Sequence, residues 1–490
     1  MEELARRSAT QLVKTIKTKQ ISSGELVQYF MERYYRLNPK INAIVATDFD
    51  SALKKAQEAD TALARGEDWG PLHGLPITLK DGFETTEFPT TFGSPLFKNY
   101  IPAQNGEVVQ ALVDAGAIIF GKTNLSLFAM DTQSFNDVYG QTNNPWDVTK
   151  TPGGSSGGSA AALAAGLTGL DMGYDGGGSI RQPAHFCGVY GHKPTYGIVP
   201  LHGSVSSSFR NKTNYTVDLD LVVNGPMARS AQDLSLAMNI LAKPPTYQQK
   251  AVHIHLPEPR KTKLKDFRVG FWINDPSVPM DIEVGICLQN LLDRLVSEKI
   301  SLTDEKPDVD LLQCHHLRGY FDVAMQSHLT PQEGIDEISE LVKQLNKEDK
   351  SFKTIIARTL VGDHREWNIK NQTRALIRQN WEDYFRKFDV LLCPVTTIPA
   401  HSHDHTDKFS RTIEVNAQTY DYWETTMPWN ALAQVAYLPA TVAPIGFTSA
   451  GLPVGIQIIG PYLEDHTPIQ FAGHLEEIHG SFQLPPGFGD

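Results

Sequence analysis

The chain has 490 residues, of which 41% are hydrophobic and 20% are charged, and its formal net charge is −12. The length allows two or three domains with a large buried core, and the composition is ordinary for a soluble globular protein. The negative charge disfavours a nucleic acid or an anionic membrane as a partner, and we expect neither.

Cysteine usage and the N-terminal residues indicate the compartment. The four cysteines are widely spaced and form no CxxC pair, which is typical of unpaired thiols in a reducing compartment. The N-terminal residues include no apolar stretch like that of a secretory signal, and no run of eighteen apolar residues occurs. The sequence therefore predicts a cytoplasmic protein.

The first 45 residues predict two helices. Ser22 with Glu25 three residues later forms a capping box, and apolar residues then recur at helical spacing. We expect Asn38-Pro39 to end this second helix, because proline cannot continue the backbone hydrogen bonding.

Further along the chain, short apolar runs alternate with amphipathic segments. This alternation predicts an α/β fold. The expected strands are residues 77–79, 117–120, 267–272, 390–394 and 452–459. The expected helices are residues 108–115, 159–167, 284–298, 335–350 and 367–388, while 201–224 and 243–265 read as irregular.

Two serine-bearing glycine runs are the most informative feature of the chain. They are Gly153–Ser159 and Asp175–Arg181. Glycine allows the backbone to adopt positive φ or to approach another group closely. Three glycines before Ser179 can turn consecutive N–H groups toward one point, as a serine nucleophile with an oxyanion hole requires.

Lys80 is the candidate base. An ordinary lysine has a pKa near 10.4 and is protonated at neutral pH, so it accepts no proton. Burial disfavours the ammonium and lowers this pKa. The apolar neighbours Ile77, Leu79 and Phe83 are consistent with burial.

These motifs resemble the signature of the amidase signature family, serine hydrolases with a Ser–cisSer–Lys triad. The resemblance is carried by Lys80-Asp81 and by residues 153–166 and 175–194, and it covers about residues 9–460. It is weaker between 243 and 389. Four further segments are similar to recurring segments of the family: Gly121–Asn124, Asn144–Trp146, Gly225–Arg229 and Gly451–Gln457.

The resemblance implies a role for each matching residue. Ser179 resembles the nucleophile, Ser155 the cis-serine and Lys80 the catalytic lysine. The backbone N–H groups of Gly176, Gly177, Gly178 and Ser179 would form the oxyanion hole. The supporting hydrogen bonds would come from Ser156, Asp175 and Arg181.

The resemblance also implies a fold: a large mixed, mostly central twisted sheet flanked by helices on both faces. We expect a single domain over residues 1–490, with a signature core at about 75–230 and a more variable, helix-rich region at about 244–389. No composition break divides the chain.

Met130, Asp131 and Thr132 occupy the segment that lines the substrate cleft in relatives. Gln182 stands where many members are apolar, and it indicates a polar acyl group. We therefore place these four residues in the substrate pocket.

Two other motif matches have less support from their surroundings. Gly153–Gly157 matches the G-x-S-x-G nucleophile elbow of α/β-hydrolases, but that elbow needs a hydrophobic strand before it, and residues 143–152 are polar and interrupted by proline. His401, His403 and His405 alternate around Asp404, yet neither HExxH nor CxxC accompanies them. We expect no metal and no cofactor.

The sequence predicts an amidohydrolase that cleaves a small-molecule carboxylic amide through an acyl-serine intermediate, with a Lys–cisSer–Ser proton relay. One alternative is the ammonia-producing A subunit of a glutamyl-tRNA amidotransferase. Ile198, where the family often has arginine, and the irregular tract 201–224 argue against it. A second alternative is a catalytically inactive binding relative. The amide's identity, ester cleavage, and the choice between monomer and homodimer stay open.

Overall fold

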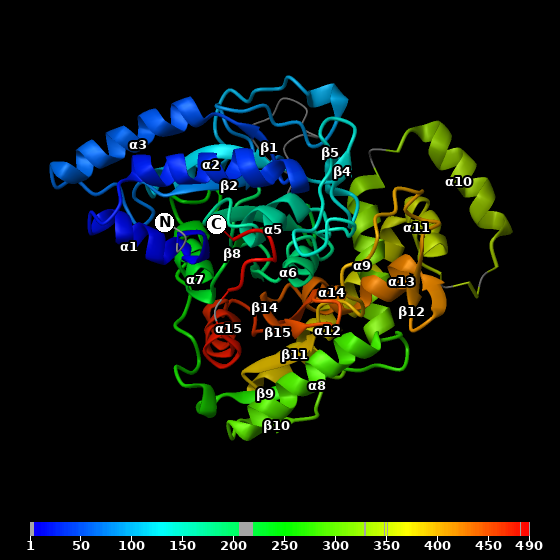
Figure 1. Ribbon diagram of the computed structural model, residues 1–490. Coiled ribbons are helices and arrows are strands. Elements are labelled where there is room, and N and C mark those ends of the chain that lie inside the picture. The colour runs from blue at the N-terminus through cyan, green and yellow to red at the C-terminus, as the bar shows by residue number, and fades with distance from the viewer. Residues whose placement is uncertain are drawn as a thin grey trace.

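The computed structural model describes residues 4–204, 219–327, 330–346, 348–349, 351–480 and 482–489. An eight-stranded mixed sheet forms the centre of the molecule (Figure 1), with the strand order β10-β9-β11-β15-β14-β7-β8-β6. The strands β10, β9 and β11 are parallel, and all the other pairs are antiparallel. Its strands are β6 (Leu170–Asp175), β7 (Tyr190–Lys193), β8 (Val223–Ala228), β9 (Arg268–Phe271), β10 (Ser301–Thr303), β11 (Val390–Pro394), β14 (Ala440–Phe447) and β15 (Pro453–Ile459).

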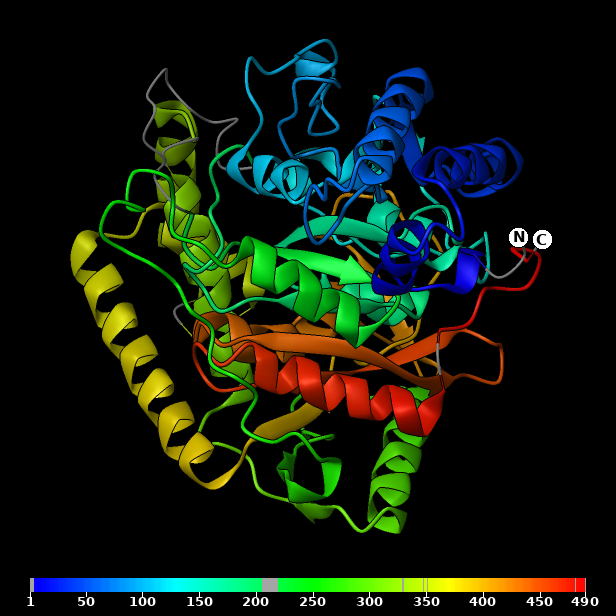
Figure 2. The same ribbon diagram turned by 90° about the vertical axis from the view of Figure 1, so that its left-hand side faces the viewer.

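Helices cover both faces of this sheet, which confirms the expected architecture. The helices α7 (Ala231–Leu241) and α15 (His466–His479) pack against one face (Figure 2, where α15 is red). The helices α5 (Gly157–Ala164) and α6 (Arg181–Cys187) pack against the other face. Both of these helices follow a glycine run directly, so the sheet fixes where the two runs lie.

A second, three-stranded sheet continues the first at β6. It has the order β1-β3-β2, with β1 (Ile44–Thr47), β2 (Pro76–Lys80) and β3 (Ile118–Thr123). Strand β2 contacts β6, and the Thr78 hydroxyl donates to Asp171 Oδ2 at 2.5 Å. This contact brings the end of β2, which carries Lys80, beside the strand that leads to Asp175.

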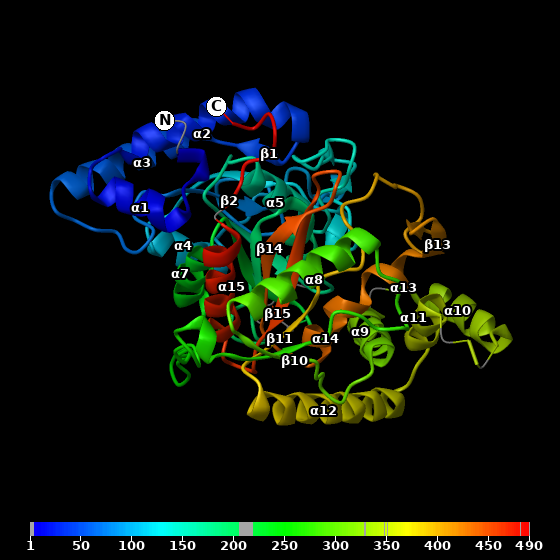
Figure 3. The same cartoon turned by 60° about the horizontal axis from the view of Figure 1, so that its bottom comes forward.

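The remaining elements surround these sheets. In Figure 3, α12 runs along the lower edge while α10 stands away from the body. These helices are α1 (Ala9–Lys17), α2 (Ser23–Ile41), α3 (Phe49–Ala64), α4 (Glu107–Asp114), α8 (Ile282–Ser297), α9 (Leu311–Gln326), α10 (Gln332–Gln344), α11 (Phe352–Leu360), α12 (His364–Lys387), α13 (Tyr422–Thr426) and α14 (Pro428–Val435). Two short hairpins lie outside both sheets: β4 (Phe135–Asn136) with β5 (Gly140–Gln141), and β12 (Thr412–Val415) with β13 (Gln418–Asp421).

The expected elements are confirmed with shifts of a few residues at their ends. The capping box is formed, since Ser22 and Glu25 each accept the other's backbone N–H. The expected stop at Asn38-Pro39 is wrong: α2 continues to Ile41 and ends at Asn42, which has positive φ. The irregular tract 201–224 lies in part outside the described residues.

All four cysteines lie in the described part of the chain, and each is buried and unpaired, as expected. Among the described residues, no helix combines the length and the apolar character that a membrane crossing needs.

The bond from Thr78 to Asp171 generates a first prediction. Both side chains are fully buried, and burial raises the pKa of Asp171 to about 6, partly offset by the hydrogen bond from Thr78. We expect Thr78→Val to lower the free energy of unfolding by about 1–3 kcal/mol, because the carboxyl loses a donor that water cannot replace. Urea unfolding measures this difference. Thr419→Val, on the exposed strand β13, is the control and should change stability little; equal effects of the two substitutions would contradict the argument.

Candidate active site

Lys80 is the last residue of β2 and is fully buried. Its Nζ lies 2.6 Å from Ser155 Oγ and 2.8 Å from Ser156 Oγ. The structure therefore brings together one amine and two hydroxyl groups that are 75 and 76 residues apart in the sequence.

The environment of Lys80 favours its neutral form. Burial lowers the pKa of Lys80 well below its usual range, and the charges of Asp175 and Asp171 offset only part of this effect. The ring of Tyr174 lies 3.5 Å from Nζ, a contact that favours the ammonium. Desolvation is the larger effect, so the surroundings shift the equilibrium toward the neutral amine, the form that has a lone pair for a proton.

The turn that carries Ser155 is held from outside the glycine run. The Gly154–Ser155 peptide bond is cis, as the resemblance implied. Ser134 Oγ lies 3.0 and 3.2 Å from the carbonyl oxygens of Gly153 and Ser155, and it accepts the Gly157 N–H at 2.9 Å. A Cβ on Gly154 would lie 2.6 Å from the Gln133 nitrogen. Only glycine therefore fits there.

Ser179 lies at the second glycine run, and it is half-buried while Lys80 and Ser155 are fully buried. The Ser156 N–H donates to the Ser179 carbonyl oxygen at 3.2 Å, which holds the two serine turns against each other. Ser179 is thus the member of the expected triad that a molecule arriving from solvent can reach.

Asp175 and Arg181 fix the second run. The guanidinium of Arg181 donates to both carboxylate oxygens of Asp175, at 2.9 and 3.0 Å. Burial alone would raise the pKa of Asp175, but Arg181 lowers it to about 2. Arg181 Nη1 also reaches the Asn430 carbonyl oxygen and Gln457 Oε1, at 2.8 and 2.7 Å.

One of the expected oxyanion-hole donors, the Gly178 N–H, already has a partner in this structure. The Gly178 N–H donates to Asp175 Oδ1 at 2.7 Å, so it is not free to bind an oxyanion. Gly178 is instead needed for its shape, because its φ is +104° and a Cβ would lie 2.6 Å from Asn430. Gly176, Gly177 and Ser179 remain as candidate donors.

The segment expected to line the substrate pocket packs against the first run. A Cβ on Gly154 would lie 2.6 Å from the Thr132 carbonyl carbon and 2.9 Å from the Asp131 carbonyl oxygen. Asp131 forms a two-point ion pair with Arg411 at 2.7 and 2.8 Å, and Thr132 bonds the Tyr422 hydroxyl at 2.7 Å. The side chains of Asp131 and Thr132 are thus already engaged within the protein, whereas the neighbouring Met130 is 45% exposed.

Several residues near the site were not anticipated. Ser134, Tyr174, Asn430 and Gln457 contact the expected site residues. Tyr174 adjoins the second glycine run and Gln457 ends the segment Gly451–Gln457, whereas no local pattern marks Ser134 or Asn430.

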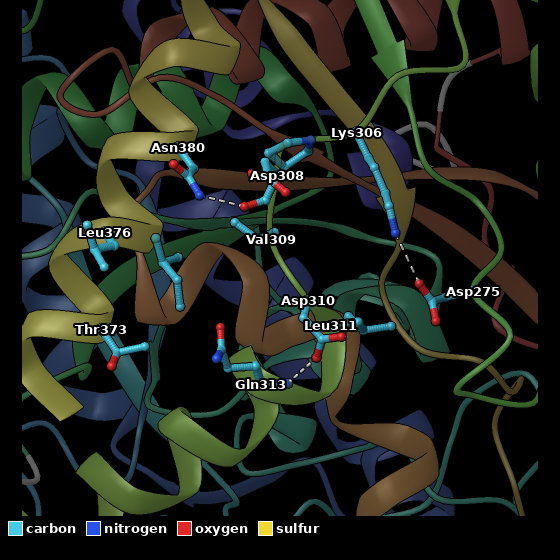
Figure 4. A pocket seen from close by; sticks show the side chains of 12 residues that line it. Asp275, Lys306, Asp308, Val309, Asp310, Leu311, Gln313, Thr373, Leu376 and Asn380 are labelled. Carbon is cyan, nitrogen blue, oxygen red and sulfur yellow. Dashed lines mark hydrogen bonds and ion pairs between the residues drawn. The ribbon is translucent and has the colours of Figure 1, made fainter. Parts of the chain in front are cut away.

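A surface pocket of about 530 Å³ lies elsewhere, between α12 and the segment that precedes α9 (Figure 4). It includes an ion pair of Lys306 with Asp275 at 3.5 Å. None of the expected catalytic residues lines it.

The chain matches a known family and known proteins over most of its length. The sequence profile of the Amidase family matches residues 25–468. The A subunit of glutamyl-tRNA(Gln) amidotransferase from Carboxydothermus hydrogenoformans is 33% identical over 97% of this chain and 98% of the relative. The corresponding protein of Acaryochloris marina is 32% identical over 94% of this chain and 95% of the relative.

Solved structures share the fold. A crystal structure described as an amidase superposes with a TM-score of 0.78 and 26% identity, and covers 97% of this chain and 100% of that one. The A subunit of glutamyl-tRNA(Gln) amidotransferase from Thermotoga maritima superposes with a TM-score of 0.76 and 24% identity, over 98% of both chains.

The neutral state of Lys80 generates a second prediction. Between the lowered folded pKa and the unfolded value near 10.5, the unfolded chain binds one more proton than the folded chain, so stability rises with pH in this window. In Lys80→Met this contribution is absent. We expect the unfolding free energy of the wild type to gain on that of the variant as the pH approaches about 10, by up to about 1.4 kcal/mol per pH unit.

The measurement is urea unfolding of both proteins at several pH values. Lys14→Met, at an exposed position, serves as the control and should follow the wild type at every pH. Parallel curves for wild type and Lys80→Met would mean that the amine stays protonated in the folded protein.

Proposed function

The chain belongs to the amidase family, and from this premise we propose that it hydrolyses a carboxylic amide to acid and amine or ammonia through an acyl-Ser179 intermediate. The observation that carries the proposal is the 2.6 Å contact of a fully buried lysine amine with Ser155, beside a half-buried Ser179. In this proposal, residues 1–490 form one catalytic domain.

We propose a proton relay through these three residues. Neutral Lys80 accepts the proton of Ser155 while Ser155 accepts that of Ser179, and Ser179 Oγ attacks the amide carbonyl. The N–H groups of Gly176, Gly177 and Ser179 bind the oxyanion that forms. The relay then runs in reverse to protonate the departing nitrogen, and water hydrolyses the acyl-serine by the same path.

The sequence left two possibilities for the substrate. The relatives favour the second one, that of an ammonia-producing A subunit of a glutamyl-tRNA amidotransferase. The matched relatives at 32–33% identity carry the name of the A subunit of glutamyl-tRNA(Gln) amidotransferase, and they are matched over nearly their full length. We therefore propose that the amide is a primary amide and that the nitrogen leaves as ammonia, as in the ammonia-producing member of such an enzyme.

Of the two sequence features that argue against this alternative, the structure accounts for one. Ile198 is 3% exposed and belongs to the hydrophobic core, so it is explained by packing. Residues 205–218 of the irregular tract lie outside the described residues.

The expected partners change with this proposal. A chain of this kind works together with other subunits, and the relatives' name includes a glutamyl-tRNA, so the expectation that no nucleic acid is involved is not supported. A net charge of −12 disfavours direct contact of this chain with a nucleic acid. We propose that another subunit holds the tRNA.

Substitution of the three proposed catalytic residues generates a third prediction. We expect Ser179→Ala, Ser155→Ala and Lys80→Met each to lower kcat for amide hydrolysis by about 10⁴–10⁶-fold, because each removes one member of a relay that acts as a unit. Ammonia release at saturating amide measures kcat.

Labelling by a fluorophosphonate probe separates the roles, because only Ser179→Ala should remove the labelled atom. Ser297→Ala, at an exposed position on α8, is the control and should keep full activity. Undiminished labelling of Ser179→Ala would place the nucleophile elsewhere.

The choice of amide generates a fourth prediction. If the chain belongs to an amidotransferase complex, ammonia release from glutamine should increase at least tenfold when the other subunits of a glutamyl-tRNA(Gln) amidotransferase from the same source are added. Glutamine hydrolysis is followed with and without these subunits, with Ser179→Ala as the blank. Full activity on other amides and no response to the added subunits would instead favour a stand-alone amidase.

A further inference from the structure

The Lys80 amine has a third neighbour besides the hydroxyl groups of Ser155 and Ser156. Its Nζ lies over the ring of Tyr174, 3.5 Å from the ring centre. So short a distance places the nitrogen on the face of the ring, because the ring atoms would keep a nitrogen at the edge farther from the centre. Tyr174 is 2% exposed and directly precedes Asp175 at the end of β6. The ring thus closes one side of the candidate base.

These three neighbours match the three directions in which a neutral amine can interact, since it has two N–H groups and one lone pair. Ser155 Oγ at 2.6 Å and Ser156 Oγ at 2.8 Å are its hydrogen-bond partners among the residues that the structure describes. If the lone pair takes the Ser155 proton and one N–H donates to Ser156, the ring of Tyr174 receives the other N–H. An aromatic face accepts an N–H, but more weakly than an oxygen atom does.

Lys122, on the neighbouring strand β3, is another fully buried lysine, and its surroundings differ. Its Nζ donates to the Phe83 carbonyl oxygen at 2.6 Å and to Thr90 Oγ1 at 3.3 Å, and it lies 3.7 Å from Asp81 Oδ1. Each of these neighbours is an oxygen atom, and one belongs to a carboxylate, which suits an ammonium. Of the two lysines, Lys80 is the one with an aromatic face in place of an oxygen.

Packing, not a hydrogen bond, holds this ring in place. The Tyr174 hydroxyl is buried and has no partner within the described part of the chain. The ring of Phe83 lies 5.7 Å from that of Tyr174. A Cβ on Gly82 would lie 2.7 Å from Tyr174 Cε1, so the missing side chain of Gly82 gives the ring its space. Because an unpaired buried hydroxyl is unfavourable, the ring face is the part of Tyr174 that serves the site.

We infer that Tyr174 is a positioning residue of the proton relay: its ring accepts one N–H of Lys80 and excludes water from that side, so the lone pair faces Ser155. The inference rests on the proposed function, in which Lys80 is the base. A water molecule or an oxygen acceptor in place of the ring would bind the ammonium more strongly and hold the proton on Lys80. The ring therefore fixes the amine with a weaker hold on the proton than an oxygen would give.

The charged groups that face Lys80 come from β6 and from its own strand. Asp175 and Asp171 both raise the pKa of Lys80, against the larger effect of burial. Asp81, the next residue after Lys80, is engaged in the ion pair with the second buried lysine. Substitution of Tyr174 leaves all of these charges in place, so a shift in the pH dependence of the relay reports on the ring.

Two substitutions separate the ring from its hydroxyl: Tyr174→Ser removes the ring and makes room for water, whereas Tyr174→Phe keeps the ring. The rate at which a fluorophosphonate probe labels Ser179, measured as a function of pH, follows the relay without any choice of amide. We expect Tyr174→Ser to move the acid limb of this profile upward by about one pH unit or more, which lowers the rate on that limb about tenfold or more. Tyr174→Phe should keep the wild-type profile.

Tyr174→Gln fills more of the space and supplies an oxygen acceptor, so it should shift the acid limb in the same direction as Tyr174→Ser. Circular dichroism checks that each variant is folded, and Tyr174→Gln replaces Tyr174→Ser if the smaller side chain prevents folding. Tyr190→Ser is the matched control, because Tyr190 on β7 is also 2% exposed. It should lower stability without moving the acid limb.

A lower rate in Tyr174→Ser with an unmoved acid limb would mean that the ring only fills space, and would overturn the inference. So would a Tyr174→Phe variant that loses as much as Tyr174→Ser. A shifted labelling profile in a protein that hydrolyses no amide would support the role of Tyr174, while the proposed function fails separately.

Urea unfolding tests the inference without any chemistry at Ser179. The pH-dependent gain in stability that Lys80 provides is measured against Lys80→Met in each background. A higher pKa of Lys80 narrows the pH window of this gain, so the gain should shrink in Tyr174→Ser and persist in Tyr174→Phe. An equal gain in the wild type and in Tyr174→Ser overturns the inference.

Discussion

The rest of the site depends on the burial of the Lys80 amine, which has no access to water. Lys80 is fully buried, and burial lowers its pKa well below the usual value. A protonated lysine at this position would hold the Ser155 hydroxyl as an acceptor and could take no proton from it. Because the amine is desolvated, Lys80 is the candidate base, and Ser155, 2.6 Å away, is its candidate proton donor.

Two turns lie near this amine: the first is held from outside its glycine run, and the second is held by the first and last residues of its own run. Ser134 holds the carbonyl oxygens of the Ser155 turn, and Asp175 with Arg181 holds the turn of Ser179. Asp175 takes up the Gly178 N–H as well, so the carboxylate competes with the expected oxyanion hole for one donor. The Gly178 N–H thus stabilises the shape of the turn, and the N–H groups of Gly176, Gly177 and Ser179 remain as candidate donors to a ligand.

The same machinery serves different amides within a family, so specificity must come from groups outside the triad. Here Arg318 and Asn430 border the turn of the candidate oxyanion donors, and each has a buried polar atom without a partner among the described residues. A substrate that supplied their missing partners would be selected strongly, since a site with buried polar groups rejects molecules that leave them unpaired. The Met130–Thr132 segment contributes less, because Asp131 and Thr132 are already paired with Arg411 and Tyr422.

The sequence by itself predicted part of the secondary structure and the residues whose role depends on the local shape of the chain. Patterns in the sequence located β2, β3, β15 and α5, but not β6, α6, α9 or α14. The two glycine runs and Lys80 marked the candidate site, because a tight turn needs glycine wherever the chain folds, and the resemblance to a family assigned the role of each residue. The sequence misplaced the end of α2, since Pro39 fits in the last turn of a helix that tertiary contacts carry on to Ile41. Only the tertiary structure decided that Gly178 donates to Asp175, that Ser134 supports the cis peptide, and that Arg318 lies 3.2 Å from a Cβ position on Gly177. The first contact depends on how the second glycine run folds, and the other two join residues that are far apart in the sequence, so no pattern along the chain records them.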